Sequence, residues 1–210
     1  NSLMYDYEGE ESYNASYLMT DIDIGPKVNV VAGIRNETNV TSYSSKNSLD
    51  HALPHWVCVF EDTKYKRENS YLLPAIFLNY KPTYWLNVKL AQTNTLTRPD
   101  YTSIVPLNRA NGQYKTLEWR NKTLEPALSN NLDFSLSLNE NKLGFFSLGY
   151  FQKEIDGLIY SSGSRVFFEE DSNRIDLSSN YHDYRILDYE LNNPNKLYLK
   201  GWELDYQTRL

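Results

Sequence analysis

The stretch YWLNVKLAQTNTLTRPDY, residues 84–101, decides the fold class. Its first part alternates apolar and polar residues, which is the period of a β-strand whose two faces meet different surroundings. Proline has no backbone donor, so a strand inside a sheet should not continue unbroken through Pro99. The stretch therefore predicts a two-faced strand that ends at Arg98 and Pro99. Its apolar face carries Leu86, Val88 and Leu90, and its polar face carries Asn87, Lys89 and Thr93.

The same alternation recurs along the chain, with little helical periodicity between the segments that show it. It predicts about seven strands and an all-β fold. The pattern is clear at residues 28–37, 84–93 and 130–139, and less regular at 13–24, 70–80, 143–159 and 197–207.

Composition excludes several classes of protein. No window approaches the ~18 consecutive apolar residues of a membrane-spanning helix. The net charge of −6, with no cluster of Lys or Arg, argues against nucleic acid as a partner. The 18 Tyr and 4 Trp beside 8 Phe are typical of a β protein with much aromatic surface. The single cysteine cannot form an internal disulfide, so hydrogen bonds and packing must stabilise the fold.

Short and long connections alternate between the predicted strands. A compact soluble domain rarely carries three long loops without structure. A transmembrane β-barrel has short periplasmic turns at one rim and long external loops at the other. The order therefore predicts an antiparallel meander that forms part of such a barrel. The short turns are at 25–27, 81–84 and 139–142, and the long irregular stretches at 39–69, 95–129 and 160–195.

The polar face of each predicted strand suits the water-filled or plugged lumen of a barrel. Tyr84 and Trp85 beside one turn, and Trp202 and Tyr206 in the last strand, lie where a girdle of interfacial aromatic residues is expected. A soluble secreted β-sandwich that binds carbohydrate is the alternative, because a sheet with one solvated face also alternates.

The break after the opening strand resembles a signature of TonB-dependent outer-membrane receptors, in which a lumen-lining strand ends in T-L-x-R-P-D/N-[FY] at the external rim. Arg98, Pro99, Asp100 and Tyr101 match that signature. Further on, RNKTLEPALSNNLDFSLSL, residues 120–138, is similar to the family's start of the next strand. Arg120, Lys122 and Glu125 depart from the family pattern there, and the matching residues are Asn121, Leu124, Pro126, Ser129, Asn130 and Asp133.

Three other segments, 17–39, 143–159 and 200–207, resemble further strands of this family in the same order, most closely in receptors of Bacteroidota. The family has a plug domain with a TonB box and a barrel of about 22 strands. We therefore expect residues 1–210 to be a late part of a barrel domain, with the plug domain and the C-terminal strands absent.

The resemblance implies a receptor of the Gram-negative outer membrane that actively takes up a scarce nutrient such as a siderophore, cobalamin or a glycan. Its expected partners are outer-membrane lipid, a small polar ligand and, through a plug outside this chain, the TonB complex. The resemblance implies neither an enzyme nor a cofactor. The motif residues at 98–101 and 121–133 are expected to be structural. For Arg98 and Asp100 a short ion pair that holds the corner is favoured, and contact with a ligand at the rim is the alternative.

Two segments carry residue types that bind metals, but neither predicts a metal site. His51, His55 and Cys58 are too few for a tetrahedral zinc site, and Pro54 disrupts a helix that would align the two histidines. The acidic segment at 169–176 lacks the glycine and the spacing of an EF-hand loop. It contains Glu169, Glu170, Asp171, Asn173 and Asp176.

Catalysis has no support in the sequence. His182 and Asp183 with one of the many serines would complete a Ser-His-Asp set. No G-x-S-x-G elbow accompanies them, so a hydrolase is not predicted.

Overall fold

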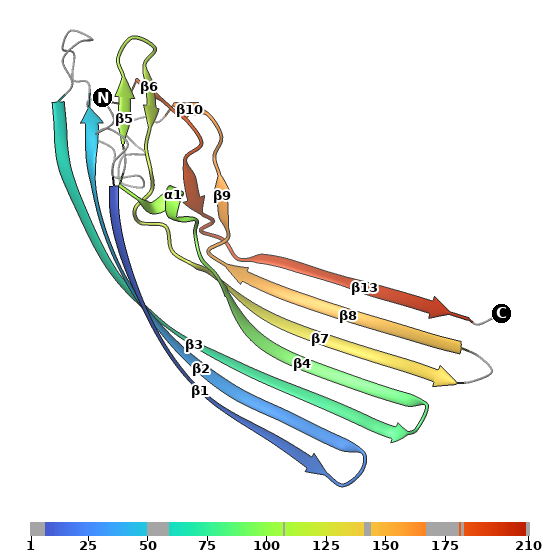
Figure 1. Cartoon of the computed structure of the whole chain (residues 1–210). Helices are drawn as coiled ribbons and strands as arrows, with labels where there is room; N and C mark the ends of the chain where they lie inside the picture. Colours follow the sequence, from blue (N-terminus) through green and yellow to red (C-terminus); the bar gives the residue numbers. More distant parts are fainter. Residues whose placement is uncertain are drawn as a thin grey trace.

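The computed structural model describes residues 7–49, 59–106, 108–140, 144–166, 181 and 183–208. Seven long strands form a curved antiparallel meander in which each strand pairs with the next (Figure 1). This confirms the predicted all-β partial barrel, which these strands do not close because β1 and β13 lie at its two edges. The strands are β1 (Tyr7–Ile24), β2 (Val28–Leu49), β3 (Val59–Thr83), β4 (Leu86–Thr97), β7 (Ala127–Glu140), β8 (Gly144–Asp156) and β13 (Leu197–Gln207).

Short turns join the strands at one rim. The β1–β2 turn is residues 25–27, as predicted, and Gly25 adopts a φ of 66° that few other residues tolerate. Strand β3 continues through the predicted turn as far as Thr83, with a register shift after Tyr80, so Tyr84 and Trp85 make the second turn. The residues between Glu140 and Gly144 lie outside the described part of the chain.

The prediction of an irregular stretch at 39–69 is wrong. β2 continues to Leu49 and β3 begins at Val59, and the two strands pair in unbroken register over this length. β1 likewise begins at Tyr7, earlier than predicted. Most side chains of both faces are polar at residues 39–46 and 62–69, so the alternation that marks a half-buried strand ends although the strand does not.

Cross-strand pairing aligns the two faces into continuous rows. Six successive pairings link apolar residues of all seven strands, and the neighbouring row of the opposite face is polar or glycine. The apolar row is Ile22, Val30, Leu78, Leu90, Phe134, Tyr150 and Trp202, and the polar row is Asp23, Asn29, Asn79, Lys89, Ser135, Gly149 and Glu203. We call the face with the polar row the inner face, and the opposite one the outer face.

The other long connections also fold. The 95–129 stretch contains α1 (Tyr101–Ile104), β5 (Arg109–Asn111) and β6 (Thr116–Glu118), and the 160–195 stretch contains most of four short strands. Periodicity in the sequence does not predict these short strands, because each is only two or three residues long. These four strands are β9 (Ile159–Ser161), β10 (Arg165–Val166), β11 (Arg185–Ile186) and β12 (Glu190–Asn192).

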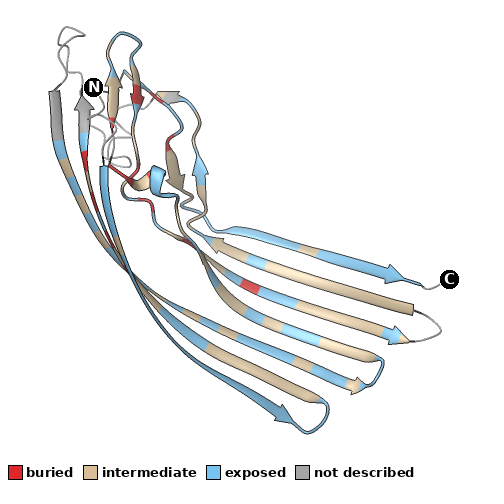
Figure 2. Ribbon diagram, viewed as in Figure 1, coloured by how far each residue is buried: buried red, intermediate tan, exposed pale blue. Residues whose placement is uncertain are grey.

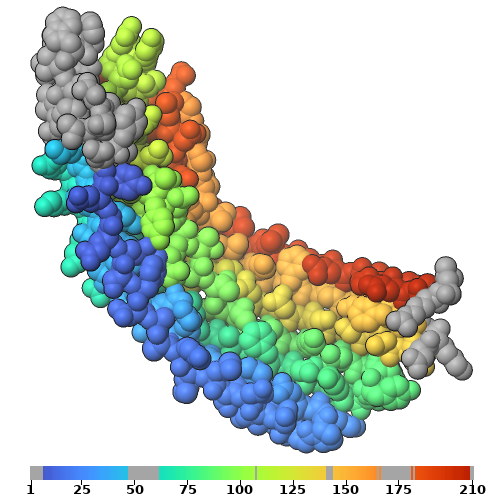
Figure 3. Space-filling model, in the orientation of Figure 1, coloured from blue at the N-terminus to red at the C-terminus, as the bar shows by residue number. Residues whose placement is uncertain are grey.

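These short elements form a loop cluster at the end of the seven-stranded meander opposite the short turns (Figures 1 and 3). We call the meander the wall. β5 and β6 make a hairpin, β11 pairs parallel with β6, and β9 pairs with β12. Leu117, Tyr181, Ile186 and Tyr189 are buried together and give the loop cluster a core of its own. Figure 2 shows that the buried residues gather here, while the strands below are mostly exposed or half-buried. Within the described ranges, no helix has the length and apolar character needed to cross a membrane.

Candidate functional site

The site is built around the corner where β4 ends. Pro99 follows the end of the strand, and the Asp100 side chain accepts a hydrogen bond from the Thr102 backbone N–H at 3.1 Å. Asp100 is therefore the N-cap of α1, a position that favours Asp because its side chain satisfies a free N–H of the first turn. The motif thus ends one element and begins the next within three residues.

Arg98 fastens this corner to β2. Its Nη2 contacts Glu37 Oε2 at 2.5 Å, and its guanidinium lies 5.1 Å from the centre of the Tyr13 ring on β1. Arg35 Nε donates to Glu37 Oε1 at 2.5 Å, and the two arginine hydrogen bonds hold the pKa of the Glu37 carboxyl below its ordinary value. The expected ion pair between Arg98 and Asp100 is wrong, because each has a different partner.

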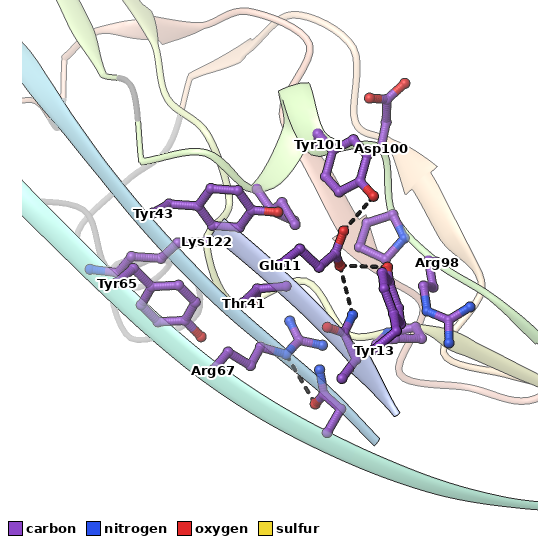
Figure 4. Close-up of a pocket in the computed structure, with 15 residues that line it drawn as sticks. Glu11, Tyr13, Thr41, Tyr43, Tyr65, Arg67, Arg98, Asp100, Tyr101 and Lys122 are labelled. Atoms are coloured by element: carbon purple, nitrogen blue, oxygen red, sulfur yellow. Dashed lines mark hydrogen bonds between the residues drawn. The ribbon is translucent and has the colours of Figure 1, made fainter. Parts of the chain in front are cut away.

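Tyr101 fastens the corner to β1 through Glu11. The Tyr101 hydroxyl donates to Glu11 Oε2, while Tyr13 Oη and Asn39 Nδ2 donate to Glu11 Oε1 at 2.5 and 2.8 Å (Figure 4). Burial raises the pKa of the Glu11 carboxyl, but the hydrogen bonds from Tyr101, Tyr13 and Asn39 outweigh it and keep the pKa below its ordinary value. The result is an ionised carboxylate that joins three elements.

The second motif shapes the segment that leads into β7. Asn121 Nδ2 donates to the Glu190 carbonyl at 2.9 Å, and its Oδ1 accepts from the Thr123 N–H at 3.1 Å. Leu124 is fully buried, and its carbonyl accepts a hydrogen bond from Arg67 of β3. These contacts fix the 121–126 segment against both the loop cluster and the wall.

The remaining residues of this motif differ in their surroundings. Pro126 lines a cavity, Asn130 is exposed on the outer face and Asp133 is exposed on the inner face. The buried residue is instead Asn131, whose Nδ2 donates to the side chain of Thr95 at 3.1 Å. Burial and bonding therefore single out Asn131 rather than its neighbour Asn130.

A cavity of about 330 Å³ lies between the inner face and the Arg98–Tyr101 corner (Figure 4). β2 contributes Asn39, Thr41 and Tyr43, and β3 contributes Tyr65 and Arg67. Tyr43 is 5% exposed and Asn39 is 8% exposed. Tyr43 Oη and Asn39 Oδ1 are both buried without a hydrogen-bond partner in the described part of the protein. Burial raises the pKa of Tyr43 to about 12, so its hydroxyl is neutral at physiological pH.

Sequence reasoning singled out the corner but missed the strand residues that hold it and line the cavity. The sequence of β2 does contain a signal for the residues that line the cavity, because polar residues recur at every second position after its outer face becomes polar. The signal is readable only if the strand is known to continue there. The missed residues are Glu11, Tyr13, Glu37, Asn39, Tyr43, Tyr65 and Arg67.

Most of the other candidate residues from the sequence lie outside the described part of the chain. These are His51, His55, Cys58, the 169–176 segment and His182. Asp183 is described, is exposed and lies 3.5 Å from Lys115 Nζ. In the ranges that the structure covers, no group of three or more His, Cys, Asp or Glu residues is placed to hold a metal ion.

A family model and several solved structures match the chain. A family model described as "TonB dependent receptor-like, beta-barrel" matches residues 1–210. The structure is similar to the hemophore receptor HasR of Serratia marcescens, solved as a double mutant in complex with its hemophore HasA and heme, with a TM-score of 0.66 and 15% identity. It is also similar to Fiu, the ferric-catecholate import receptor of E. coli K12, with a TM-score of 0.59 and 13% identity.

The match spans 95% of this chain but 32% of the HasR chain, and 94% of this chain but 25% of the Fiu chain. At such low identity these likenesses show a shared fold. No curated protein matches the sequence.

Proposed function

Because this chain belongs to the TonB-dependent receptor-like β-barrel family, we propose that it forms part of the wall and external loops of an outer-membrane receptor of a Gram-negative bacterium. The receptor takes up a scarce nutrient such as a siderophore, cobalamin or a glycan. It acts as a transporter and not as an enzyme, and it needs no cofactor of its own. The motif resemblance favours a receptor of the Bacteroidota type.

The outer apolar row carries this proposal. Ile22, Leu90 and Trp202 are 49%, 42% and 69% exposed, and no second sheet packs on them in the described part of the chain. A soluble β-sandwich would bury such a row against another sheet. A barrel wall turns it toward lipid and turns the polar row toward the lumen.

Membership of the family supports an inference about the parts of the receptor outside residues 1–210. Residues 1–210 are part of one barrel domain, and we infer that the full-length protein supplies a plug and further strands. The plug connects the receptor to the TonB complex, which supplies energy for uptake. In this arrangement the loop cluster and the cavity below it lie at the external rim, where a ligand arrives first.

Fractionation of the native host tests this function. We expect the full-length protein to remain with the outer membrane after washing and to be extracted only by detergent. We also expect nutrient-limited growth that depends on the receptor to be lost in a strain without TonB. Recovery in the soluble fraction would contradict the transporter and support the soluble carbohydrate-binding alternative.

A further inference from the structure

One row of the inner face carries large apolar side chains, although the row beside it is polar. It crosses all seven strands and lies next to the polar row, on the side of the loop cluster. β2, β3 and β8 each contribute a large apolar side chain to it, and Phe77 of β3 is 44% exposed. We call it the phenylalanine row, and its members are Asp21, Val31, Phe77, Ala91, Asp133, Phe151 and Gly201.

A groove runs along the phenylalanine row. A hollow of about 240 Å³ is lined by Phe77, and one of about 550 Å³ is lined by Phe145 and Phe151. Asp133 and Ser135 line both hollows, so the two adjoin in the middle of the wall. Most of the lining residues belong to the inner face. Together the hollows form one groove from β3 to β13, which we call the inner groove.

Gly201 fixes how Phe151 lies in the inner groove. The two residues are cross-strand partners, and a Cβ added to Gly201 would come within 2.7 Å of the Phe151 ring. The ring therefore reaches across to β13 and lies over the glycine. A larger residue at position 201 would push the ring away from the sheet. The glycine thus keeps the ring against the wall, as part of the floor of the groove.

The position of the phenylalanine row favours a permanent cover. The predicted lumen is either water-filled or plugged, and a contiguous exposed apolar surface marks a contact with another part of a protein. Val31 lies four residues after the β1–β2 turn, so the row is near the short turns and away from the loop cluster. A nutrient occupies a receptor only during uptake, whereas apolar surface is costly in water at all times. A resident part of the receptor therefore fits this surface better than the nutrient does.

Chain outside residues 1–210 is available to supply the cover. The match spans 32% of the HasR chain and 25% of the Fiu chain, so most of each of those two proteins lies outside the part that corresponds to this wall. In the proposed receptor, the plug is the part that lies inside the barrel.

The charges beside the phenylalanine row indicate the chemistry of its cover. Asp133 is exposed in the middle of the inner groove, where both hollows meet. On this row and the two inner-face rows next to it, carboxylates outnumber ammonium groups. The carboxylates are those of Asp21, Asp23, Asp133 and Glu203, and the ammonium groups are those of Lys89 and Lys153. Electrostatic complementarity favours a partner surface that carries Lys or Arg around an apolar centre.

We propose that the plug of the full-length receptor is seated on the inner groove. Apolar side chains of the plug cover Phe77 and Phe151, and its Lys or Arg side chains face Asp133 and Glu203. This rests on the proposed function, since it names the surface of the wall that holds the plug of that receptor. The lumen is dry at the level of the phenylalanine row while the plug is in place.

The test is photo-crosslinking of the full-length receptor in its native outer membrane. Phe77 or Phe151 is replaced by the photoreactive analogue p-benzoylphenylalanine, and crosslinked peptides are identified by mass spectrometry after irradiation. We expect both positions to crosslink to the plug. Tyr114 is the matched control position, because it is 71% exposed between β5 and β6 and lines neither hollow, and it should give no crosslink to the plug.

Gly201→Ala provides an independent variant, because it displaces the ring at position 151 without removing it. It should lower the yield of plug crosslinks from position 151 by about twofold or more, and leave the yield from position 77 unchanged. Heat-dependent migration in gels establishes that every variant contains a folded barrel.

Crosslinks from positions 77 and 151 to the external loops alone would overturn the proposal, as would no crosslink at either position, which would show a water-filled groove. Neither result would change outer-membrane location or TonB-dependent growth, on which the proposed function depends. A full-length sequence without a plug would instead contradict the proposed function itself.

Discussion

Glu11 shows how one side chain fixes a long connection against the strands of the sheet. Its carboxylate accepts hydrogen bonds from Tyr13 on its own strand, from Asn39 on β2 and from Tyr101 at the start of α1. Tyr101 lies 90 residues away in sequence, so this bond closes a long connection onto the barrel wall. Because hydrogen bonds to an ionised group are stronger than neutral ones, the attachment depends on the charge of Glu11.

The attachment of α1 should therefore weaken in acid. The pKa of Glu11 is below its ordinary value of 4.5 in the folded protein, so its stabilisation is present above pH 4.5 and is lost as pH falls through the lower, folded-state pKa. We expect hydrogen exchange of the 98–104 amides, corrected for the intrinsic pH effect, to accelerate below pH 4.5.

The Glu11→Gln variant separates this effect from other titrations. Glu37 also has a lowered pKa, because it accepts hydrogen bonds from Arg98 and Arg35, and it titrates equally in both proteins. The variant should show faster exchange at neutral pH and a smaller change on acidification. An identical pH profile for the two proteins would mean that Glu11 does not hold the corner.

At the scale of the strand, the outer face of β2 changes from apolar to mainly polar side chains partway along its length. Its outward side chains are apolar from Val28 to Ile34 and, apart from Val40, polar from Asn36 to Lys46. The facing positions of β3 change one row later, between Leu72 and Ser70. The strand itself continues to Leu49. A transmembrane strand needs about 9–11 residues, so in the proposed outer-membrane receptor the part of β2 that follows Ile34 extends beyond the membrane.

Arginine substitutions on one face of β2 test this boundary. Ile34 is 41% exposed on the outer face within the apolar stretch, whereas Ser42 is exposed on the same face above it. We expect Ile34→Arg to lower the free energy of unfolding of the full-length protein in liposomes by roughly 2–4 kcal/mol. Ser42→Arg, its control, should change it by no more than about 1 kcal/mol. Equal effects from both substitutions would show that the boundary is placed wrongly.

This boundary also explains what the sequence predicts and what it does not. The seven strands are predictable because one face of the sheet is apolar and the other is polar, which gives the sequence a period of two. Near the loop cluster most side chains on both faces of β2 and β3 are polar, so the period disappears and the strand ends are missed. Arg98 and Tyr101 are recognisable within a local motif. Their partners Glu37 and Glu11 are decided by strand register, which joins residues 61 and 90 positions apart.

At the scale of the whole molecule, the meander is a wall with two open edges. Among the described residues β1 pairs only with β2, and β13 pairs only with β8. Each edge therefore presents a row of backbone N–H and C=O groups that are not paired with a neighbouring strand of the described chain. Backbone groups without partners are too costly in lipid, so a stable membrane form requires that both edges be closed by further strands.

Residues 1–210 expressed alone should therefore fail to form a stable monomer in detergent. We expect strand-rich oligomers that associate through the edges of β1 and β13, because edge strands pair readily with other chains. Light scattering after size-exclusion chromatography measures the mass, and the full-length receptor in the same detergent is the control that should elute as one defined species. A monodisperse monomer of the 210-residue chain with native strand content would contradict the open wall. It would instead favour a self-contained sheet whose edges are protected without a barrel.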